Sequence, residues 1–255
     1  MAALVNVQPM PLSGRRAVVT GASGGIGSAI VRALMAQGAT VHCLDRVRPD
    51  AVDMGEAALY QVDLADRTAT DRVLGELCTE LGGACDILVN GAGISRVCPF
   101  EASDDVLLDA HFAVNFTAAF RVTRTLLPML RASGRASVVN IASELAMVGQ
   151  TGFSAYSASK GALLAWSRTL AIELAGDRIR VNAVCPGPTD TDMLANEFAT
   201  APDALQARRQ EIAGIPAGRL GTPAEIAAVI AFLAGDASAY VTGAAWSVDG
   251  GKTAS

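Results

Sequence analysis

The sequence predicts an α/β protein: a Rossmann-type, doubly wound parallel sheet of about seven strands with helices on both faces. Two observations predict this fold. Short β-rich runs alternate with longer runs of helical periodicity, and such alternation implies parallel strands joined by right-handed crossovers. No proline- or serine-rich linker, repeat or block of like charges divides the 255 residues, so we expect one domain over residues 1–255.

The expected elements follow from these runs in chain order. The first strand covers residues 17–20 and meets Gly21, and apolar residues at helical spacing, such as Ile26 and Leu34, place the first helix at 25–37. The further strands are expected at 40–45, 59–62, 87–90, 137–141, 180–184 and 245–248, and the further helices at 66–81, 104–131 and 156–174.

Residues 186–216 interrupt the alternation of strands and helices. Prolines and glycines surround one short amphipathic piece there, and the next helix starts only at Thr222-Pro223, where Glu225 completes a capping box. A long irregular insertion in a compact domain is often a lid over a ligand site. We therefore expect a substrate lid at 186–216, with a loose surface loop as the alternative.

The composition excludes several classes of protein. A hydrophobic fraction of 51% and a charged fraction of 18% exclude a disordered chain. A net charge of -5 and an aromatic fraction of 5% give no electrostatic or stacking reason to bind nucleic acid, or an anionic membrane surface. No apolar run approaches the roughly 18 residues of a membrane span. We expect neither nucleic acid nor a membrane as a partner.

The cysteines and histidines indicate neither disulfides nor a metal site. The five cysteines are an odd number without a CxxC pair, and the two histidines, His42 and His111, lie far apart in the sequence. We expect no metal and a structural His42. His111 could reach the functional site, but a place in solvent or at a subunit contact is the preferred expectation. Cys43 and Cys185 read as small buried hydrophobes, and no signal peptide is visible over residues 1–14, so a reducing, cytoplasmic location is expected.

A glycine-rich segment from Thr20 to Gly27 follows the first strand and opens the first helix. Glycines allow a tight turn and the close approach of a pyrophosphate, which the N–H groups and dipole of a helix N-terminus would bind. Asp45 closes the second strand, where a carboxylate can accept hydrogen bonds from the adenosine ribose. The alternative is a turn-forming loop without a ligand. The dinucleotide-binding residues expected here are Gly21, Ser23, Gly25, Ile26, Gly27 and Asp45.

Tyr156 and Lys160 are four residues apart and therefore share one face of the expected helix 156–174. A phenol has a pKa near 10, too high for a base at neutral pH, but a nearby ammonium favours the phenolate. Lowering that pKa by roughly three units takes about 4 kcal/mol, which a lysine in water could not supply but a lysine beside a cationic nicotinamide in a dry site could. An exposed helix pair is the alternative.

Ser143 follows the strand 137–141 by two residues, and so lies at the edge of the sheet where ligands bind in open α/β folds. Its hydroxyl could hydrogen-bond a substrate oxygen. A serine after a strand is ordinarily a turn residue, so the functional interpretation depends on its combination with Tyr156 and Lys160.

Together these features resemble the short-chain dehydrogenase/reductase family, in its single-domain branch of about 250 residues. The resemblance covers the chain from about Leu12 to Lys252, and its departures are small: Gly91 replaces the more usual second asparagine of an NNAG segment, and Pro188 and Thr189 fill positions that are more often apolar. The landmarks, in order, are Thr20 to Gly27, Asp63-Leu64, Asn90-Gly91-Ala92-Gly93, Asn115, Ser143, Tyr156 with Lys160, Pro186-Gly187, Thr191 and Asp249-Gly250-Gly251.

The resemblance implies a role for each of four catalytic residues. Tyr156 would be the general acid/base, and Lys160 would lower its pKa and hold the nicotinamide ribose. Ser143 would orient the substrate oxygen. Asn115 would break the regular hydrogen bonding of its helix and hold a water in a proton path from Lys160; a tolerated exposed asparagine is the alternative.

The resemblance also implies contacts to the rest of the cofactor and to the substrate. Asp63 and Leu64 would flank the adenine, Asn90 and Gly93 would line the cofactor floor, Pro186 and Gly187 would belong to the cofactor site, and Thr189 and Thr191 would anchor the carboxamide. Residues between Ser143 and Tyr156 would border a pocket for a mid-sized substrate with an apolar body, and ordinary loop residues are the alternative. The pocket residues expected with those two are Leu145, Gln150 and Phe153.

We therefore expect an NAD(H)-dependent oxidoreductase that interconverts a secondary alcohol and a ketone, and a homotetramer with one interface formed by the helices 104–131 and 156–174. Asp45 would repel the 2′-phosphate of NADP, and Gly24 stands where NADP-dependent relatives often carry Arg or Lys, although Arg46 could turn toward a phosphate. The alternatives are an NADPH-dependent 3-oxoacyl reductase and a catalytically idle NAD-binding sensor or scaffold.

Overall fold

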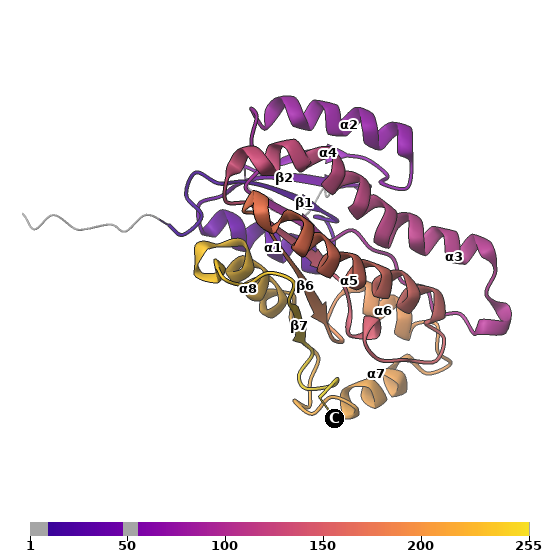
Figure 1. Cartoon of the computed structure of the whole chain (residues 1–255). Helices are drawn as coiled ribbons and strands as arrows, with labels where there is room; N and C mark the ends of the chain where they lie inside the picture. The colour runs from indigo at the N-terminus through magenta and orange to yellow at the C-terminus, as the bar shows by residue number, and fades with distance from the viewer. Residues whose placement is uncertain (1–9, 48–55, 255) are drawn as a thin grey trace, which may run out of the picture.

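The computed structural model describes residues 10–47 and 56–254, so most of the stretch 1–14 that shows no signal peptide lies outside the described residues. In this part of the chain seven parallel strands form one sheet in the order β3-β2-β1-β4-β5-β6-β7 (Figure 1). The predicted Rossmann-type, doubly wound sheet is confirmed. The strands are β1 (Arg16–Thr20), β2 (Thr40–Asp45), β3 (Ala58–Gln61), β4 (Ile87–Asn90), β5 (Ser137–Ile141), β6 (Arg180–Pro186) and β7 (Ala245–Val248).

Helices cover both faces of this sheet (Figure 1). One face carries α1 (Gly25–Ala36) and α8 (Pro223–Ala234), which pack against each other, and the other carries α2 (Arg67–Glu80), α4 (Ala118–Ser133) and α5 (Ser154–Leu174). Each face has its own buried apolar cluster. The inner strands β4 and β5 are buried along their whole length, as expected for a parallel sheet covered on both sides.

The helix predicted at 104–131 is interrupted by a π-helical turn. It consists of α3 (Asp105–Phe112), the turn η2 (Ala113–Thr117) and α4, and it ends at Gly134 in the left-handed conformation, with φ 68°. The side chain of Asn115 in this turn bonds a neighbouring loop, and such pairing is what a π turn allows. Short 3₁₀ turns occur at η1 (Phe100–Ala102), η3 (Glu144–Ala146), η4 (Ala175–Asp177) and η5 (Asp236–Ser238).

The segment 186–216 is more regular than predicted. It contains two helices, α6 (Asp192–Phe198) and α7 (Ala204–Ala213), which lie beyond the carboxyl ends of β6 and β7 (Figure 1). The side chains of Thr191 and Asp203 accept hydrogen bonds from Leu194 N and Gln206 N and so cap their first turns. Side-chain caps start helices that are too short to show a clear apolar periodicity in the sequence.

Among residues 10–47 and 56–254, no helix is long and apolar enough to cross a membrane, and no three His, Cys, Asp or Glu side chains come together as metal ligands. The five cysteines are free thiols, and Cys43 and Cys185 are buried as predicted. Burial raises the pKa of the Cys43 thiol to about 12.

Candidate active site

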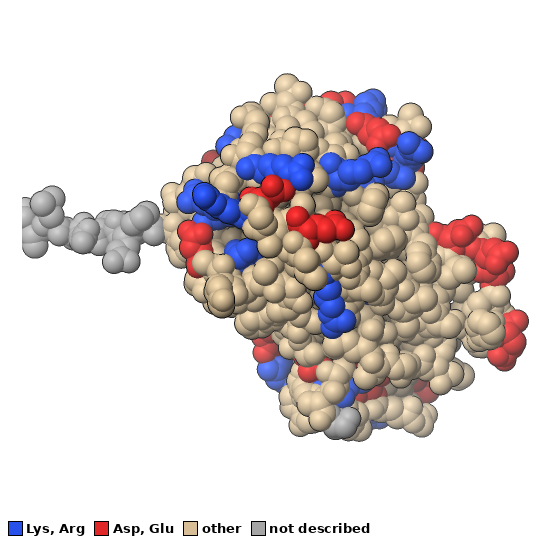
Figure 2. Space-filling model, in the orientation of Figure 1, with Lys and Arg blue, Asp and Glu red and all other residues tan. Residues whose placement is uncertain are grey.

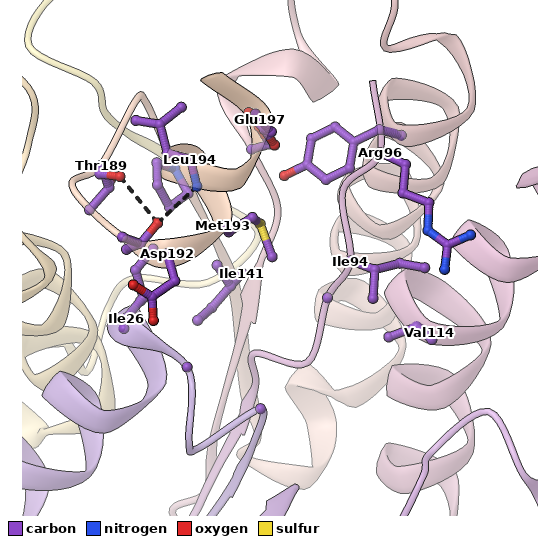
Figure 3. Close-up of a pocket in the computed structure, with 18 of the residues that line it drawn as sticks. Ile26, Ile94, Arg96, Val114, Ile141, Thr189, Asp192, Met193, Leu194 and Glu197 are labelled. Carbon is purple, nitrogen blue, oxygen red and sulfur yellow. Dashed lines mark hydrogen bonds between the residues drawn. The ribbon is translucent and has the colours of Figure 1, made fainter. Parts of the chain in front are cut away.

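A cavity of about 1020 Å³ opens at the carboxyl ends of the strands, at the point where β1 and β4 lie side by side and the strand order reverses. Ligands of open α/β sheets bind at this switch point. Figure 3 shows the cavity, with Met193 and Glu197 of α6 on one side and Ile94 and Val114 on the other. Its volume is at the upper end of the range for small-molecule sites, which suits a dinucleotide together with a substrate.

The glycine loop between β1 and α1 leaves no room for side chains. A Cβ atom on Gly27 would lie 1.9 Å from the carbonyl oxygen of Gly21, and one on Gly21, whose φ is 69°, would lie 2.7 Å from Ala92 Cα. No side chain caps the first turn of α1. The helix N-terminus is therefore available to a pyrophosphate, in the arrangement that the sequence predicts.

Asp45 at the end of β2 is held in a fixed orientation at the rim of the cavity. Its two carboxylate oxygens accept hydrogen bonds from the backbone N–H groups of Ser23, at 2.9 Å, and Val47, at 3.0 Å. The first of these bonds links the end of β2 to the glycine loop. Arg46 lines the same cavity. The carboxylate expected to repel a 2′-phosphate of NADP and the arginine that could attract it therefore lie next to each other.

Ser143, Tyr156 and Lys160 come together at the opposite end of the cavity. Ser143 follows β5, is 7% exposed and caps the turn η3, and its hydroxyl hydrogen-bonds the phenol of Tyr156. The Lys160 ammonium is buried one turn of α5 further on, where it donates to the Ile141 carbonyl at 2.7 Å and lies 5.9 Å from the centroid of the Tyr156 ring. Residues from β5 and α5 thus form one constellation.

The protein alone does not produce a phenolate at Tyr156. Burial raises the pKa of its phenol to about 12; the hydrogen bond from Ser143 opposes this shift, and the Glu197 and Glu144 carboxylates add to it. Burial also lowers the pKa of Lys160 to about 8. A positive charge close to the phenol would be needed to favour the phenolate, and the joint action of a lysine and a cationic nicotinamide stays a prediction.

Asn115 is buried, so the alternative of an exposed asparagine is excluded. Its side chain accepts a hydrogen bond from Ile94 N at 2.8 Å and donates to Ile94 O at 3.0 Å and to Ser159 Oγ at 2.9 Å. A Cβ on Gly93 would lie 3.3 Å from Lys160 Nζ and 3.4 Å from Asn115 Oδ1. Asn115 and Lys160 therefore meet beneath Gly93, behind the wall of the cavity.

The other expected cofactor residues fall into two groups. Asn90 does not line the cavity, since its amide lies between the sheet and α4, where it donates to Thr123 Oγ1 at 3.0 Å and Asn140 Oδ1 at 2.7 Å. The amide ties β4 to α4 and β5, and the residues that follow it, Gly91 to Gly93, reach the surface of the site. The expected residues that do line the cavity are Asp63, Leu64, Gly93, Pro186, Gly187, Thr189 and Thr191.

The expected substrate residues Leu145, Gln150 and Phe153 all line the cavity. Phe153 is buried, and its ring centroid lies 6.1 Å from that of Tyr156 in an edge-on contact. Sequence reasoning assigned no role to Glu197, which lies in the lid segment beside the predicted anchor Thr191. It lines the cavity from α6, a helix that the sequence did not predict, so no sequence signal marked it.

The prediction for His111 was wrong. Its side chain is fully buried rather than in solvent, because its Nδ1 donates to the Leu107 carbonyl at 2.8 Å and its ring packs edge-on against Tyr156 at 6.3 Å. It belongs to the packing around Tyr156. His42 is structural as expected, with Nδ1 3.3 Å from the Tyr60 hydroxyl inside the sheet.

The residues present fit a nicotinamide dinucleotide. The glycine cradle excludes side chains, the N-terminus of α1 has no side-chain cap, and Asp45 presents an oriented carboxylate about where a ribose would follow the pyrophosphate. A Cβ on Gly25 would lie 2.8 Å from Thr191 Cγ2, so the cradle and the lid segment meet over the same space.

Comparison with known proteins agrees with this geometry. The chain belongs to the short-chain dehydrogenase/reductase family and is an NAD(P)-dependent oxidoreductase: the family model described as Enoyl-(Acyl carrier protein) reductase matches residues 21–253.

Among its relatives, Nodulation protein G of Rhizobium sp. (strain N33) is 39% identical over 94% of this chain and 97% of its own, and the 3-oxoacyl-[acyl-carrier-protein] reductase FabG of Thermotoga maritima is 36% identical over 95% and 99%. A crystal structure from Beutenbergia cavernae, provisionally named an NAD(P) dependent gluconate 5-dehydrogenase and containing NADP at low occupancy, superimposes with a TM-score of 0.88 at 36% identity, covering 97% of this chain and 100% of that one.

Proposed function

We propose that this enzyme uses NAD(H) to interconvert a secondary alcohol and a ketone. The observation that carries the proposal is that Ser143 and Tyr156 line the same cavity as the glycine cradle, with Lys160 buried beside Tyr156 and the Asp45 carboxylate at the rim. A binding module would need the cradle but not the catalytic constellation. The family membership supports the same reaction class.

Each residue of the constellation has chemistry that suits one task. Ser143 would hold the substrate oxygen by a hydrogen bond, and Tyr156 would take the hydroxyl proton in oxidation and return it in reduction. Lys160 would hold the nicotinamide ribose and favour the phenolate, and Asn115 would order the path by which the proton reaches solvent. When bound, the nicotinamide would accept or supply the hydride.

The rest of the cofactor would be held by the residues around the cradle. Gly21, Ser23, Gly25, Ile26 and Gly27 would bind the pyrophosphate and Asp45 the adenosine ribose. Asp63 and Leu64 would flank the adenine. Thr189 and Thr191 would anchor the carboxamide of the nicotinamide. The lid segment 186–216 would cover the nicotinamide and the substrate, since α6 and α7 contribute to the wall of the cavity.

A second candidate is an NADPH-dependent 3-oxoacyl reductase. It is favoured by the 36% identity to the Thermotoga maritima reductase and by Arg46, whose side chain lines the cavity beside Asp45. Turnover of a 3-oxoacyl thioester with NADPH, faster than of any alcohol with NAD⁺, would select this candidate. An idle NAD-binding scaffold is the third, and it predicts no turnover at all.

The test is a panel of secondary alcohols, diols and hydroxysteroids with NAD⁺, followed by NADH absorbance. We expect the active members to lose at least 10²–10⁴-fold in rate in the Tyr156→Phe variant, the usual effect of removing a general acid/base, with the cofactor affinity largely kept. A Phe variant that keeps more than about a tenth of the rate would contradict the assigned mechanism.

A homotetramer remains a prediction, and the outer surface of α5 supports it. Charged side chains gather over α2 and α4 and become sparse over α5 (Figure 2). Trp166 on α5 packs against Phe116 and Phe120 at ring distances of 6.0 and 5.8 Å, and Phe120 and Ile172 are 42% and 81% exposed. An exposed apolar helix face of this kind suits an isologous contact with a second copy.

A cytoplasmic location also remains a prediction, based on the cysteine pattern.

A further inference from the structure

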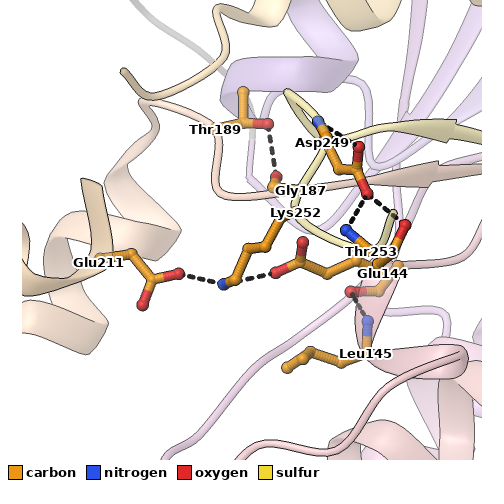
Figure 4. A network of polar contacts seen from close by, with 10 residues as sticks. Glu144, Leu145, Gly187, Thr189, Glu211, Asp249, Lys252 and Thr253 are labelled. Atoms are coloured by element: carbon orange, nitrogen blue, oxygen red, sulfur yellow. Dashed lines mark hydrogen bonds and ion pairs between the residues drawn. The ribbon is translucent and has the colours of Figure 1, made fainter. Parts of the chain in front are cut away.

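A three-residue ion network lies at the substrate end of the cavity and joins three separate segments of the chain (Figure 4). The ammonium of Lys252, near the C-terminus, donates to Glu144 Oε1 at 2.9 Å and forms an ion pair with Glu211. Glu144 directly follows Ser143, and Glu211 lies in the last turn of α7. Both carboxylates line the cavity. We refer to Glu144, Glu211 and Lys252 as the C-terminal clasp.

The clasp is largely shielded from water. The side chains of Glu144, Glu211 and Lys252 are 5%, 17% and 18% exposed. Desolvated charges of this kind are stable only while each has its partner, and removing one partner leaves an uncompensated charge. The two carboxylates bind the same ammonium, so without it they would repel each other. Lys252 therefore joins Glu211 of α7 to Glu144 of the loop after β5 through one ammonium.

The chain segment that carries Lys252 is itself fixed to both sides of the cavity. Asp249 accepts hydrogen bonds from Gly251 N at 2.9 Å and Thr253 N at 3.0 Å, which closes a tight turn. A Cβ on Gly250 would lie 2.8 Å from Ile215 Cγ2, so this turn packs on the end of the lid segment. On its other side, Gly187 N donates to the carbonyl of Val248 at 3.0 Å.

We propose that Lys252 is a positioning residue that fastens the lid helix α7 to the loop carrying Ser143, and so sets the closed shape of the substrate pocket. This rests on the proposed function, in which the segment 186–216 covers a bound alcohol or ketone. Lys252 would act through Glu144 and Glu211, which line the cavity. Among the described residues, no ion pair joins two separate segments of the chain in the cofactor half of the cavity.

The test is a cycle of variants at the clasp with steady-state kinetics. Lys252→Met should raise the KM for the alcohol about tenfold while kcat changes less than about threefold, and Lys252→Arg, which keeps the charge, should restore most of the loss. Glu211→Gln should raise KM in the wild-type chain. In the Lys252→Met variant, the ammonium is already gone and Glu144 and Glu211 repel each other. Adding Glu211→Gln to that variant removes the repulsion and should therefore lower KM. Arg72→Met, which breaks the exposed Arg72–Glu76 pair on α2, is the matched control and should change nothing.

A second measurement follows the lid without turnover. Arg208 and Arg209 in α7 are trypsin sites, and cleavage there should be several-fold faster in Lys252→Met than in the wild type or in Arg72→Met, at equal thermal stability of the three proteins. The proposal would be overturned if Lys252→Met left both the cleavage rate and KM unchanged. It would also be overturned if KM of the double variant Lys252→Met, Glu211→Gln rose by the product of the two single increases. A wild type without alcohol turnover would overturn the proposed function, while the cleavage rates would still decide on the clasp.

Discussion

The preference for NAD⁺ over NADP⁺ can be tested at one side chain, because Asp45 is held rigidly. Its carboxylate oxygens accept from Ser23 N and Val47 N at 2.9 and 3.0 Å, so it cannot swing away from a phosphate that enters the ribose site. The substitution Asp45→Asn keeps the shape and one acceptor but removes the negative charge. We expect it to weaken the discrimination against NADP⁺.

The size of the effect follows from Coulomb's law. A 2′-phosphate in the place predicted for the ribose would lie about 4 Å from the carboxylate, where two unit charges of like sign repel by about 4 kcal/mol in a partly buried site and about 1 kcal/mol in bulk water. Asp45 is partly exposed, so an intermediate value of about 2–3 kcal/mol applies. This corresponds to a factor of roughly 30–150 in the ratio of specificity constants.

The assay is kcat/KM for NAD⁺ and for NADP⁺ with one saturating alcohol. The ratio should fall by that factor in Asp45→Asn, and by far less in the control Asp63→Asn, which removes a carboxylate from another part of the same cavity. Arg46→Gln should then remove any NADP⁺ activity that the first substitution gains. A wild type that uses both cofactors equally, or a ratio in Asp45→Asn that stays within about threefold of the wild-type value, would refute the reasoning.

Two further predictions concern pH and assembly. Burial raises the pKa of Tyr156 to about 12, so the phenolate needed for oxidation becomes more abundant as the pH rises. The rate of alcohol oxidation should therefore increase from about pH 7 to 10, while the rate of ketone reduction should not. An oxidation rate that does not change over this range would contradict a tyrosine base. Ala165 on the outer face of α5 is exposed, so Ala165→Arg should be tolerated in a monomer but should break a tetramer built on α5. Light scattering should show about four chains of 26.1 kDa for the wild type and fewer for this variant, and an unchanged mass would show that α5 is not an interface.

Local signals in the sequence were sufficient for the fold and for most of the cavity wall. The alternation of apolar runs gave the strand and helix order, since each run has to cover one face of a sheet or bury both faces of a strand. The glycines of the cradle were readable because only residues without a side chain fit the spacing observed between Gly27 and Gly21. Tyr156 and Lys160 were readable because a separation of four residues fixes their common face on a helix.

Contacts between segments distant in the sequence were decided only by the tertiary structure. The amide of Asn90 is turned away from the cavity, because Thr123 of α4 and Asn140 of β5, 33 and 50 residues away, accept its hydrogen bonds. His111 was buried against Tyr156 by the crossing of α3 and α5. No local pattern marks either arrangement, because each depends on how the helices pack and not on the residues next to it in the chain.

The clasp shows the same division most clearly. Glu144 and Lys252 are 108 residues apart in the sequence, and no local pattern marks them as a pair. Their pairing requires β5, the lid segment and the C-terminal turn to meet at one edge of the sheet. Sequence periodicity determines which face of an element is apolar, whereas the pairing of single charges is determined by the packing of whole elements, where desolvation makes each unpaired charge costly.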